Sequence, residues 1–264
     1  MRKYPFFHDR KWGSPRWLQV PGHVLLAGST GSGKSVATMH MVHCLASLSP
    51  IGDRLYILDY KGSKDWKELR GCPGYWSVEE AKEGFELAYQ RFRRHLEGVE
   101  PIGDSIHWLI IDEFASLSEA YIDKKERAEF LQRFGEMMRL SRNIGDGDGG
   151  WRILVTVQQA DSTLFGGTQV RSNFGLRILV GGVSTEGKRM LFDVQDDDDT
   201  EVTSSPPGKG FAQQYGGRIM RIIFPHENRR ELVFAKVQKM LQRSNHDDGL
   251  GGTIEKTDTD DLDV

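Results

Sequence analysis

The stretch Gly28-Ser29-Thr30-Gly31-Ser32-Gly33-Lys34-Ser35 fits the phosphate-binding loop pattern G-x-x-x-x-G-K-[ST] at every fixed position. An apolar run over residues 24–27 precedes it and a helix-like run over residues 34–48 follows, as this motif requires. The glycines allow a tight turn whose N–H groups point at phosphate oxygens, and the helix N-terminus adds partial positive charge. We therefore expect residues 28–35 to bind a nucleotide, with Lys34 on the outer phosphates and Ser35 on magnesium. A chance glycine loop is the alternative, and the flanking runs disfavour it.

A second apolar run, over residues 106–111, ends in two carboxylates, Asp112 and Glu113. The run is rich in β-formers and too short for a free-standing helix, so it predicts a buried central strand. A hydrolytic nucleotide site needs an acidic residue at such a strand end for magnesium, and often a carboxylate beside it to activate water. Asp112 is the expected magnesium ligand and Glu113 the expected general base. The structural alternative is a strand that ends in a solvated acidic turn. A kinase would have less use for a second carboxylate at this position, so Glu113 favours hydrolysis over a kinase reaction.

Further strands are expected at residues 55–59, 152–157 and 176–180, with a hairpin over 210–214 and 218–224 turned at Gly216-Gly217. Long helices are expected from a capping box at residues 77–80 to about Gly98, and from Lys124 to Asn143. This alternation predicts an α/β fold: a mostly parallel, doubly wound sheet with helices on both faces and a C-terminal β-hairpin.

The 264 residues predict one main domain. Residues 1–20 are expected to form an ordered loop or short hairpin, residues 21–243 the nucleotide-binding domain, and residues 244–264 a disordered acidic tail. Residues 145–150, rich in Gly and Asp, look like an insertion, and Asp196 to Asp199 like a solvated acidic loop.

The composition describes a soluble globular protein, with 38% hydrophobic and 28% charged residues. No apolar run approaches the roughly 20 residues that span a bilayer, and no signal peptide is visible, so a cytoplasmic location is expected. A net charge of −3 excludes a protein that coats nucleic acid. It leaves open a motor that touches DNA through a few loops lining a ring, because positive potential there is local.

Three arginines and a glutamine are further candidates for the reaction. Gln158 follows the strand over 152–157, where a polar side chain can sense the γ-phosphate or orient water. Arg142, Arg171 and Arg177 lie near strand ends or loops, where a ring ATPase supplies an arginine to the neighbouring subunit. The alternative for Gln158 is a polar residue that begins a loop. The alternative for the arginines is that each is only solvated or salt-bridged.

Together these residues resemble the motor domain of the FtsK/SpoIIIE family of DNA translocases, within the FtsK–HerA group of P-loop ATPases. The similarity runs in family order from about Asp9 to Phe224. It covers residues 21–35 with their Thr-Gly-Ser-Gly-Lys-Ser core, the Asp-x-Lys turn at 59–62, Asp-Glu-Phe-Ala at 112–115, Gln158, residues 171–178, and Pro207-Gly208-Lys209-Gly210-Phe211. The chain departs from the family at residues 157–160, which read Val-Gln-Gln-Ala where the family favours Thr-Gln-Arg-Pro.

The resemblance implies a RecA-like fold, a homohexameric ring around double-stranded DNA, and translocation driven by hydrolysis of ATP with Mg²⁺. The family's membrane-spanning N-terminal part and its C-terminal winged-helix module are not visible. The chain therefore resembles the short stand-alone motors of plasmids, phages and conjugative elements, with a membrane-bound or relaxosome-type protein as the expected recruiting partner. Two alternatives stay open: a related ATPase for protein secretion or transport, and a slow nucleotide-dependent assembly or regulatory module.

Overall fold

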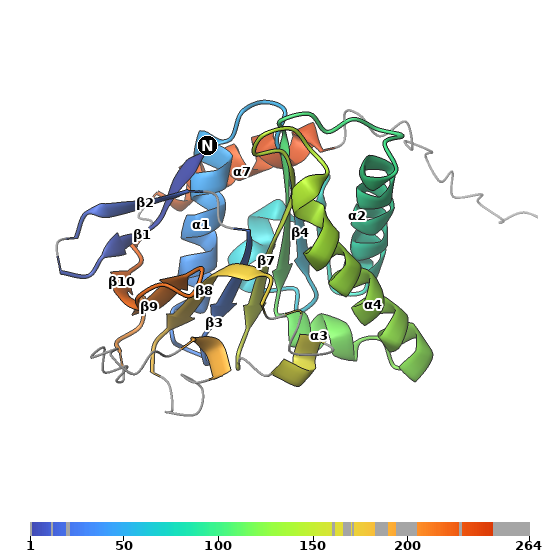
Figure 1. Cartoon of the computed structure of the whole chain (residues 1–264). Helices are drawn as coiled ribbons and strands as arrows, with labels where there is room; N and C mark the ends of the chain where they lie inside the picture. Colours follow the sequence, from blue (N-terminus) through green and yellow to red (C-terminus); the bar gives the residue numbers. More distant parts are fainter. Residues whose placement is uncertain are drawn as a thin grey trace, which may run out of the picture.

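One mixed sheet passes through the computed structural model (Figure 1), which describes residues 2–11, 13–19, 22–159, 162–165, 170, 172–182, 190–193, 205–226 and 229–244. Its strand order is β2-β1-β10-β9-β8-β3-β7-β6-β4-β5. The strands are β1 (Lys3–Asp9), β2 (Pro15–Gln19), β3 (His23–Ala27), β4 (Arg54–Asp59), β5 (Tyr75–Ser77), β6 (Ile106–Asp112), β7 (Gly150–Val157), β8 (Phe174–Val180), β9 (Lys209–Gln214) and β10 (Met220–Ile223).

The strands from β8 to β5 pair in parallel, and those from β8 to β2 pair antiparallel. The helices are α1 (Lys34–Leu48), α2 (Glu80–Leu96), α3 (Phe114–Glu119), α4 (Lys124–Leu140) and α7 (Arg230–Arg243), with 3₁₀ turns η1 (Lys64–Leu69), η2 (Ser141–Asn143) and η3 (Ser162–Phe165). The predicted α/β fold is confirmed, including the antiparallel β9–β10 hairpin. None of the described helices is long and apolar enough to cross a membrane.

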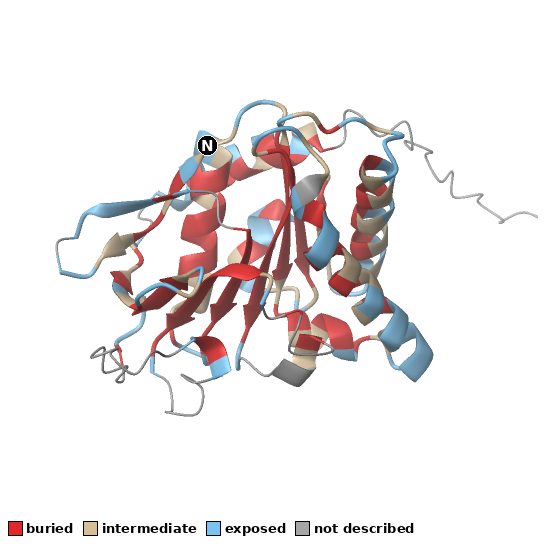
Figure 2. Ribbon diagram, viewed as in Figure 1, coloured by how far each residue is buried: buried red, intermediate tan, exposed pale blue. Residues whose placement is uncertain are grey.

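Both faces of the sheet are covered because successive residues of the central strands point to opposite sides. In β3, Val24 and Leu26 pack on one side with α1 and α7, while Leu25 and Ala27 pack on the other with α2, α3 and α4. The central strands are accordingly buried along almost their whole length (Figure 2). Such strands read as continuous apolar runs, which is why the sequence locates them well.

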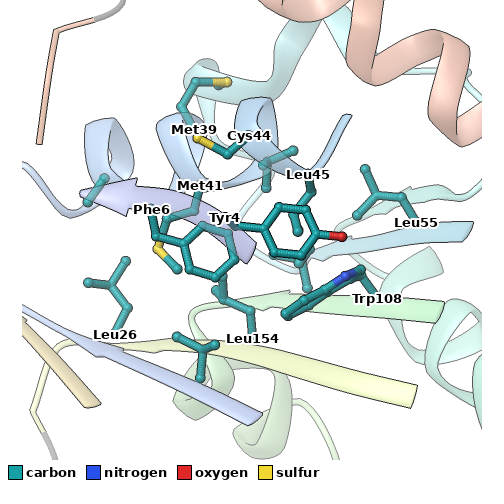
Figure 3. Close-up of a cluster of buried hydrophobic side chains, with 14 of the residues drawn as sticks. Tyr4, Phe6, Leu26, Met39, Met41, Cys44, Leu45, Leu55, Trp108 and Leu154 are labelled. Carbon is teal, nitrogen blue, oxygen red and sulfur yellow. The ribbon is translucent and has the colours of Figure 1, made fainter. Parts of the chain in front are cut away.

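The N-terminal segment belongs to this core rather than preceding it. Tyr4 and Phe6 of β1 stack with ring centroids 5.4 Å apart. Phe6 meets Trp108 edge to face at 6.2 Å, and Figure 3 shows this cluster against α1. Since β1 also pairs with β10, a domain boundary at residue 20 does not separate this hairpin from the rest. The Trp and Pro residues of this segment interrupt the alternation of polar and apolar residues from which strands are predicted.

Among the strands and α-helices of the described residues, β5, α3 and α7 were not predicted. β5 and α3 are only 3 and 6 residues long, too short to show a period. Helix α2 was expected, but its capping box is wrong: Ser77 ends β5, and the N-cap Glu79 makes no side-chain cap hydrogen bond. Residues 145–150 pack on the loop before β6, where the Asp146 N–H donates to the Gly103 carbonyl at 2.8 Å.

His23 is fully buried at the start of β3 and is held in its neutral form. Its Nδ1 accepts a hydrogen bond from the Ile153 N–H and its Nε2 donates to the Met138 carbonyl, both at 3.0 Å. Burial, with smaller contributions from the charges of Arg152 and Arg142, lowers the pKa of His23 to about 3. In the unfolded chain the His23 imidazole takes up a proton near pH 6.5, whereas in the folded protein it stays neutral down to about pH 3. The contribution of His23 to folding stability is therefore full above pH 6.5 and falls as the pH drops toward 3.

We therefore expect His23→Asn to flatten the acid side of the stability profile. Between pH 7 and pH 5 the wild-type imidazole costs the folded state about 2 kcal/mol, a loss that asparagine cannot cause because it does not titrate. Urea unfolding of both proteins at the two pH values measures the difference. An equal loss in both would show that other groups, such as the buried His107, whose pKa burial also lowers, account for the acid sensitivity.

Candidate active site

The parallel strands bring the predicted motifs to one edge of the sheet. Ala27 is in register with Val157, and Asp59 with Asp112, so the residues that follow these four meet at the carboxyl ends of the strands. Ligands of doubly wound sheets bind at this edge. The phosphate loop, Lys61, Glu113 and Gln158 therefore come together although they are spread over about half of the sequence.

The phosphate loop is braced by close backbone packing. Gly33 has φ +91°, and a Cβ there would lie 2.5 Å from the Gly208 nitrogen. That nitrogen donates to the Ser32 carbonyl at 2.9 Å, which ties the Pro207-Gly208 turn to the loop. A Cβ on Gly28 would lie 2.9 Å from the Val180 carbonyl. The loop thus has no room for larger residues at either glycine.

A cavity of about 380 Å³ lies beside this loop. All the residues predicted for catalysis or magnesium other than the arginines line it. The lining is formed by Ser29, Thr30, Gly31, Gly33, Lys34, Ser35, Val36, Lys61, Ser63, Asp112, Glu113 and Gln158. Two of the predicted loop residues, Gly28 and Ser32, are not part of this lining.

Asp112 is fixed through both carboxylate oxygens. Trp66 Nε1 donates to its Oδ2 at 2.9 Å, and the Thr156 hydroxyl donates to its Oδ1 at 2.6 Å. The same hydroxyl accepts the Glu113 N–H at 2.8 Å. One threonine on β7 therefore sets the relative position of the two carboxylates.

The backbone of Glu113 has φ 62°, a left-handed conformation that residues other than glycine rarely adopt. Its Oε2 is 2.7 Å from Lys34 Nζ and 3.3 Å from Lys61 Nζ. Burial raises the pKa of Glu113, but hydrogen bonds and charge from the two lysines outweigh burial and lower it overall. Glu113 is thus an ionised carboxylate aimed at the cavity.

Asp59 sets the turn that carries Lys61. Its Oδ2 accepts the Ser63 N–H at 2.7 Å and the Tyr75 hydroxyl at 2.9 Å. Burial raises the pKa of Asp59, and the nearby charge of Asp112 adds to this, while the hydrogen bonds oppose it. The buried carboxyl thereby anchors the 59–63 turn at the cavity rim.

The two arginine candidates that the structure describes, Arg142 and Arg177, do not line the cavity. Arg177 is buried and its Nη1 pairs with Asp193 Oδ2 at 2.7 Å, so it would have to leave this partner to serve a neighbouring subunit. The Arg142 side chain packs against Gly22, at the opposite edge of the sheet. Arg171, residues 196–199 and the tail from residue 245 lie outside the described residues.

Three contributors were missed as site residues: Lys61, Trp66 and Thr156. Lys61 had a signal, because the Asp-x-Lys turn resembles the family motif. Trp66 and Thr156 gave no such signal in the sequence, because a tryptophan or threonine next to apolar residues is typical of the hydrophobic core. Only the fold shows that both contact Asp112.

The site fits a nucleotide with magnesium. Ser32 Oγ is buried without a hydrogen-bond partner among the described residues, the glycine cradle leaves space where side chains would stand, and the lining offers two ammonium groups. Ser35 and Asp112 supply hydroxyl and carboxylate oxygens, the ligands that Mg²⁺ prefers. No larger cluster of metal-ligating side chains exists among the described residues, and Mg²⁺ on nucleotides needs only one or two protein ligands.

Comparison with known proteins agrees with this geometry. Residues 5–101 match the FtsK/SpoIIIE family model. No curated protein matches the sequence significantly. The fold is similar to the cytoplasmic domain of the Thermomonospora curvata type VII secretion ATPase EccC, with TM-score 0.64 and 21% identity over 90% of this chain and 31% of that one.

Two further structures share the fold. The pCW3 conjugation coupling protein TcpA with ATPγS gives TM-score 0.65 and 18% identity over 89% of this chain and 69% of TcpA. Thermomonospora curvata EccC ATPases 2 and 3 with a signal sequence peptide give TM-score 0.63 and 15% identity, over 86% of this chain and 41% of that one. The chain thus spans under half the length of either EccC structure. Residues 5–101 are thus similar to the FtsK/SpoIIIE family, and the strand edge they share with residues 106–158 carries the phosphate loop and carboxylates of a P-loop ATPase.

Proposed function

We propose that this chain is the motor of a DNA translocase, hydrolysing ATP in a ring of identical subunits during conjugative or other mobile-element DNA transfer. The observation that supports the chemistry is the single cavity shared by Lys34, Ser35, Asp112 and Glu113. TcpA, one of the structures with this fold, is a conjugation coupling protein.

In the proposed reaction, backbone N–H groups of residues 29–35 and the Lys34 ammonium bind the phosphates. Ser35 and Asp112 hold Mg²⁺, which when bound neutralises charge on the phosphate oxygens. Glu113, ionised and aimed at the cavity, accepts the proton of the attacking water. Gln158 at the rim orients that water, and an arginine from the next subunit completes the site.

A basic groove favours DNA as the track. A groove of about 390 Å³ at the tip of the β1–β2 hairpin and the start of β10 is lined by one acid and four basic residues. They are Asp9, Arg10, Lys11, Arg16 and Arg221, and Met220 is the remaining lining residue. The whole chain has a net charge of −3, so the positive charge is concentrated locally in this groove. Such a groove is better suited to binding the phosphate backbone of DNA than a polypeptide of arbitrary charge.

We expect the double variant Lys11→Ala/Arg221→Ala to weaken stimulation of ATPase activity by duplex DNA while leaving the DNA-free rate unchanged. Both side chains are exposed and neither lines the phosphate cavity. If both contact phosphates, the slope of log binding constant against log salt should become shallower by about 2. Lys124→Ala/Lys125→Ala at the start of α4 removes the same charge from another surface and is the control.

The competing function is a protein-transport ATPase, which the fold shared with EccC bound to a signal sequence peptide supports. Steady-state ATPase activity with and without duplex DNA, at two salt concentrations, separates the two functions. Strong, salt-sensitive stimulation supports the DNA motor. Hydrolysis indifferent to DNA would overturn it and favour a polypeptide substrate, whereas negligible turnover under all conditions would favour the assembly module.

A further inference from the structure

A second, smaller pocket continues from the phosphate cavity along α1. It is lined by Ser35, Val36, Met39, Asp65, His226 and Arg230. Ser35 and Val36 line both spaces. The two are also joined through η1, because Ser63 lines the cavity while its hydroxyl accepts the N–H of Asp65, which lines the pocket, at 3.1 Å. A ligand whose phosphates occupy the cavity can therefore extend into the pocket.

The walls of this pocket are of three kinds. Val36 and Met39 present apolar side chains from the first turns of α1. Asp65 contributes a partly exposed carboxylate from η1. On the α7 side, the Arg230 guanidinium lies 5.7 Å from the Phe234 ring centroid, donates to the Asp65 carbonyl at 3.2 Å and lies 3.9 Å from Asp65 Oδ1, so three contacts position it at the pocket.

These walls match the needs of a purine. An apolar floor accepts the ring face, and a planar guanidinium stacks on an aromatic base. A carboxylate only accepts hydrogen bonds, so it suits the exocyclic amino group of adenine and disfavours a carbonyl at the same position. The phosphate loop fixes the other end of the nucleotide at the N-terminus of α1, next to Ser35 and Val36.

We propose that this pocket receives the base of the bound nucleotide, with Asp65 reading the amino group at position 6 of adenine and Arg230 stacking on the ring. The proposal deepens the ATPase function and rests on nucleotide binding at the phosphate loop. It does not depend on whether the motor moves DNA or protein.

The test compares binding of ATP, ITP and inorganic tripolyphosphate to the wild type and to Asp65→Asn. ITP replaces the 6-amino group by a carbonyl, so the wild type should prefer ATP about tenfold, the effect of one good hydrogen bond. Asparagine can donate to that carbonyl, so the variant should bring ATP and ITP within about twofold. Tripolyphosphate, which has no base, should bind both proteins equally.

Arg230→Ala should weaken ATP binding several-fold and again spare tripolyphosphate. The controls are Glu68→Gln, on the exposed side of η1, and Arg229→Ala, the neighbour of Arg230 that does not line the pocket. Equal ATP and ITP affinities in the wild type, an unchanged preference in Asp65→Asn, or an equal loss of tripolyphosphate binding would each overturn the proposal. Wild-type failure to bind tripolyphosphate or ATP at all would instead refute the phosphate site.

Discussion

Glu113→Gln is expected to slow ATP hydrolysis by about 10²–10⁴-fold, the usual contribution of a general base. At the same time ATP should bind more tightly, not less. Glu113 Oε2 contacts Lys34 Nζ at 2.7 Å and Lys61 Nζ at 3.3 Å, so the carboxylate competes with the phosphates for both ammonium groups. The neutral amide removes this competition and also the repulsion between carboxylate and phosphate.

Single-turnover hydrolysis and equilibrium binding of ATP measure the two effects separately. Glu119→Gln, the same isosteric change at an exposed residue of α3, should alter neither. Normal turnover in Glu113→Gln would refute its role as the base. Weaker binding would refute the competition, and would show instead that Glu113 orders the two lysines for the phosphates.

The parts of the fold that sequence predicts best are those whose residues carry a strong local pattern. β3, β4, β6, β7 and β8 are buried on both faces, so each reads as an apolar run, and the phosphate loop has fixed residue types that its geometry demands. Asp112 and Glu113 were predicted as site residues for the same reason, because they end such a run. Their convergence on one cavity with Lys34 follows from parallel strands sharing a carboxyl edge.

The residues that sequence did not reveal act through tertiary contacts. Thr156 contacts Asp112 because β7 pairs with β6, and Trp66 contacts it from η1, which follows β4. His226 and Arg230 reach the first turns of α1 only because α7 packs beside α1 on one face of the sheet. Such contacts leave no periodic pattern, so a threonine in a strand and an arginine opening a helix look unremarkable.

Lys34→Ala is expected to weaken ATP binding by about 10–100-fold and to abolish measurable hydrolysis, because charge-assisted hydrogen bonds to phosphate are lost. The fold should persist, since Glu113 keeps Lys61 as a partner at 3.3 Å. Without Lys34, burial raises the pKa of Glu113 with less opposition, so the carboxyl is protonated at a higher pH than in the wild type.

Isothermal titration with ATP, a thermal melt and an infrared pH titration of the carboxylate test these three expectations. Lys34→Arg, which keeps the charge, should restore the low Glu113 pKa but not full hydrolysis, because a guanidinium does not reproduce the compact ammonium. Lys61→Ala should raise the same pKa by a smaller amount, since the contributions of Lys34 are larger than those of Lys61. ATP binding by Lys34→Ala at wild-type strength would mean that the backbone cradle alone carries the phosphate affinity, and that Lys34 serves chiefly to hold Glu113 ionised.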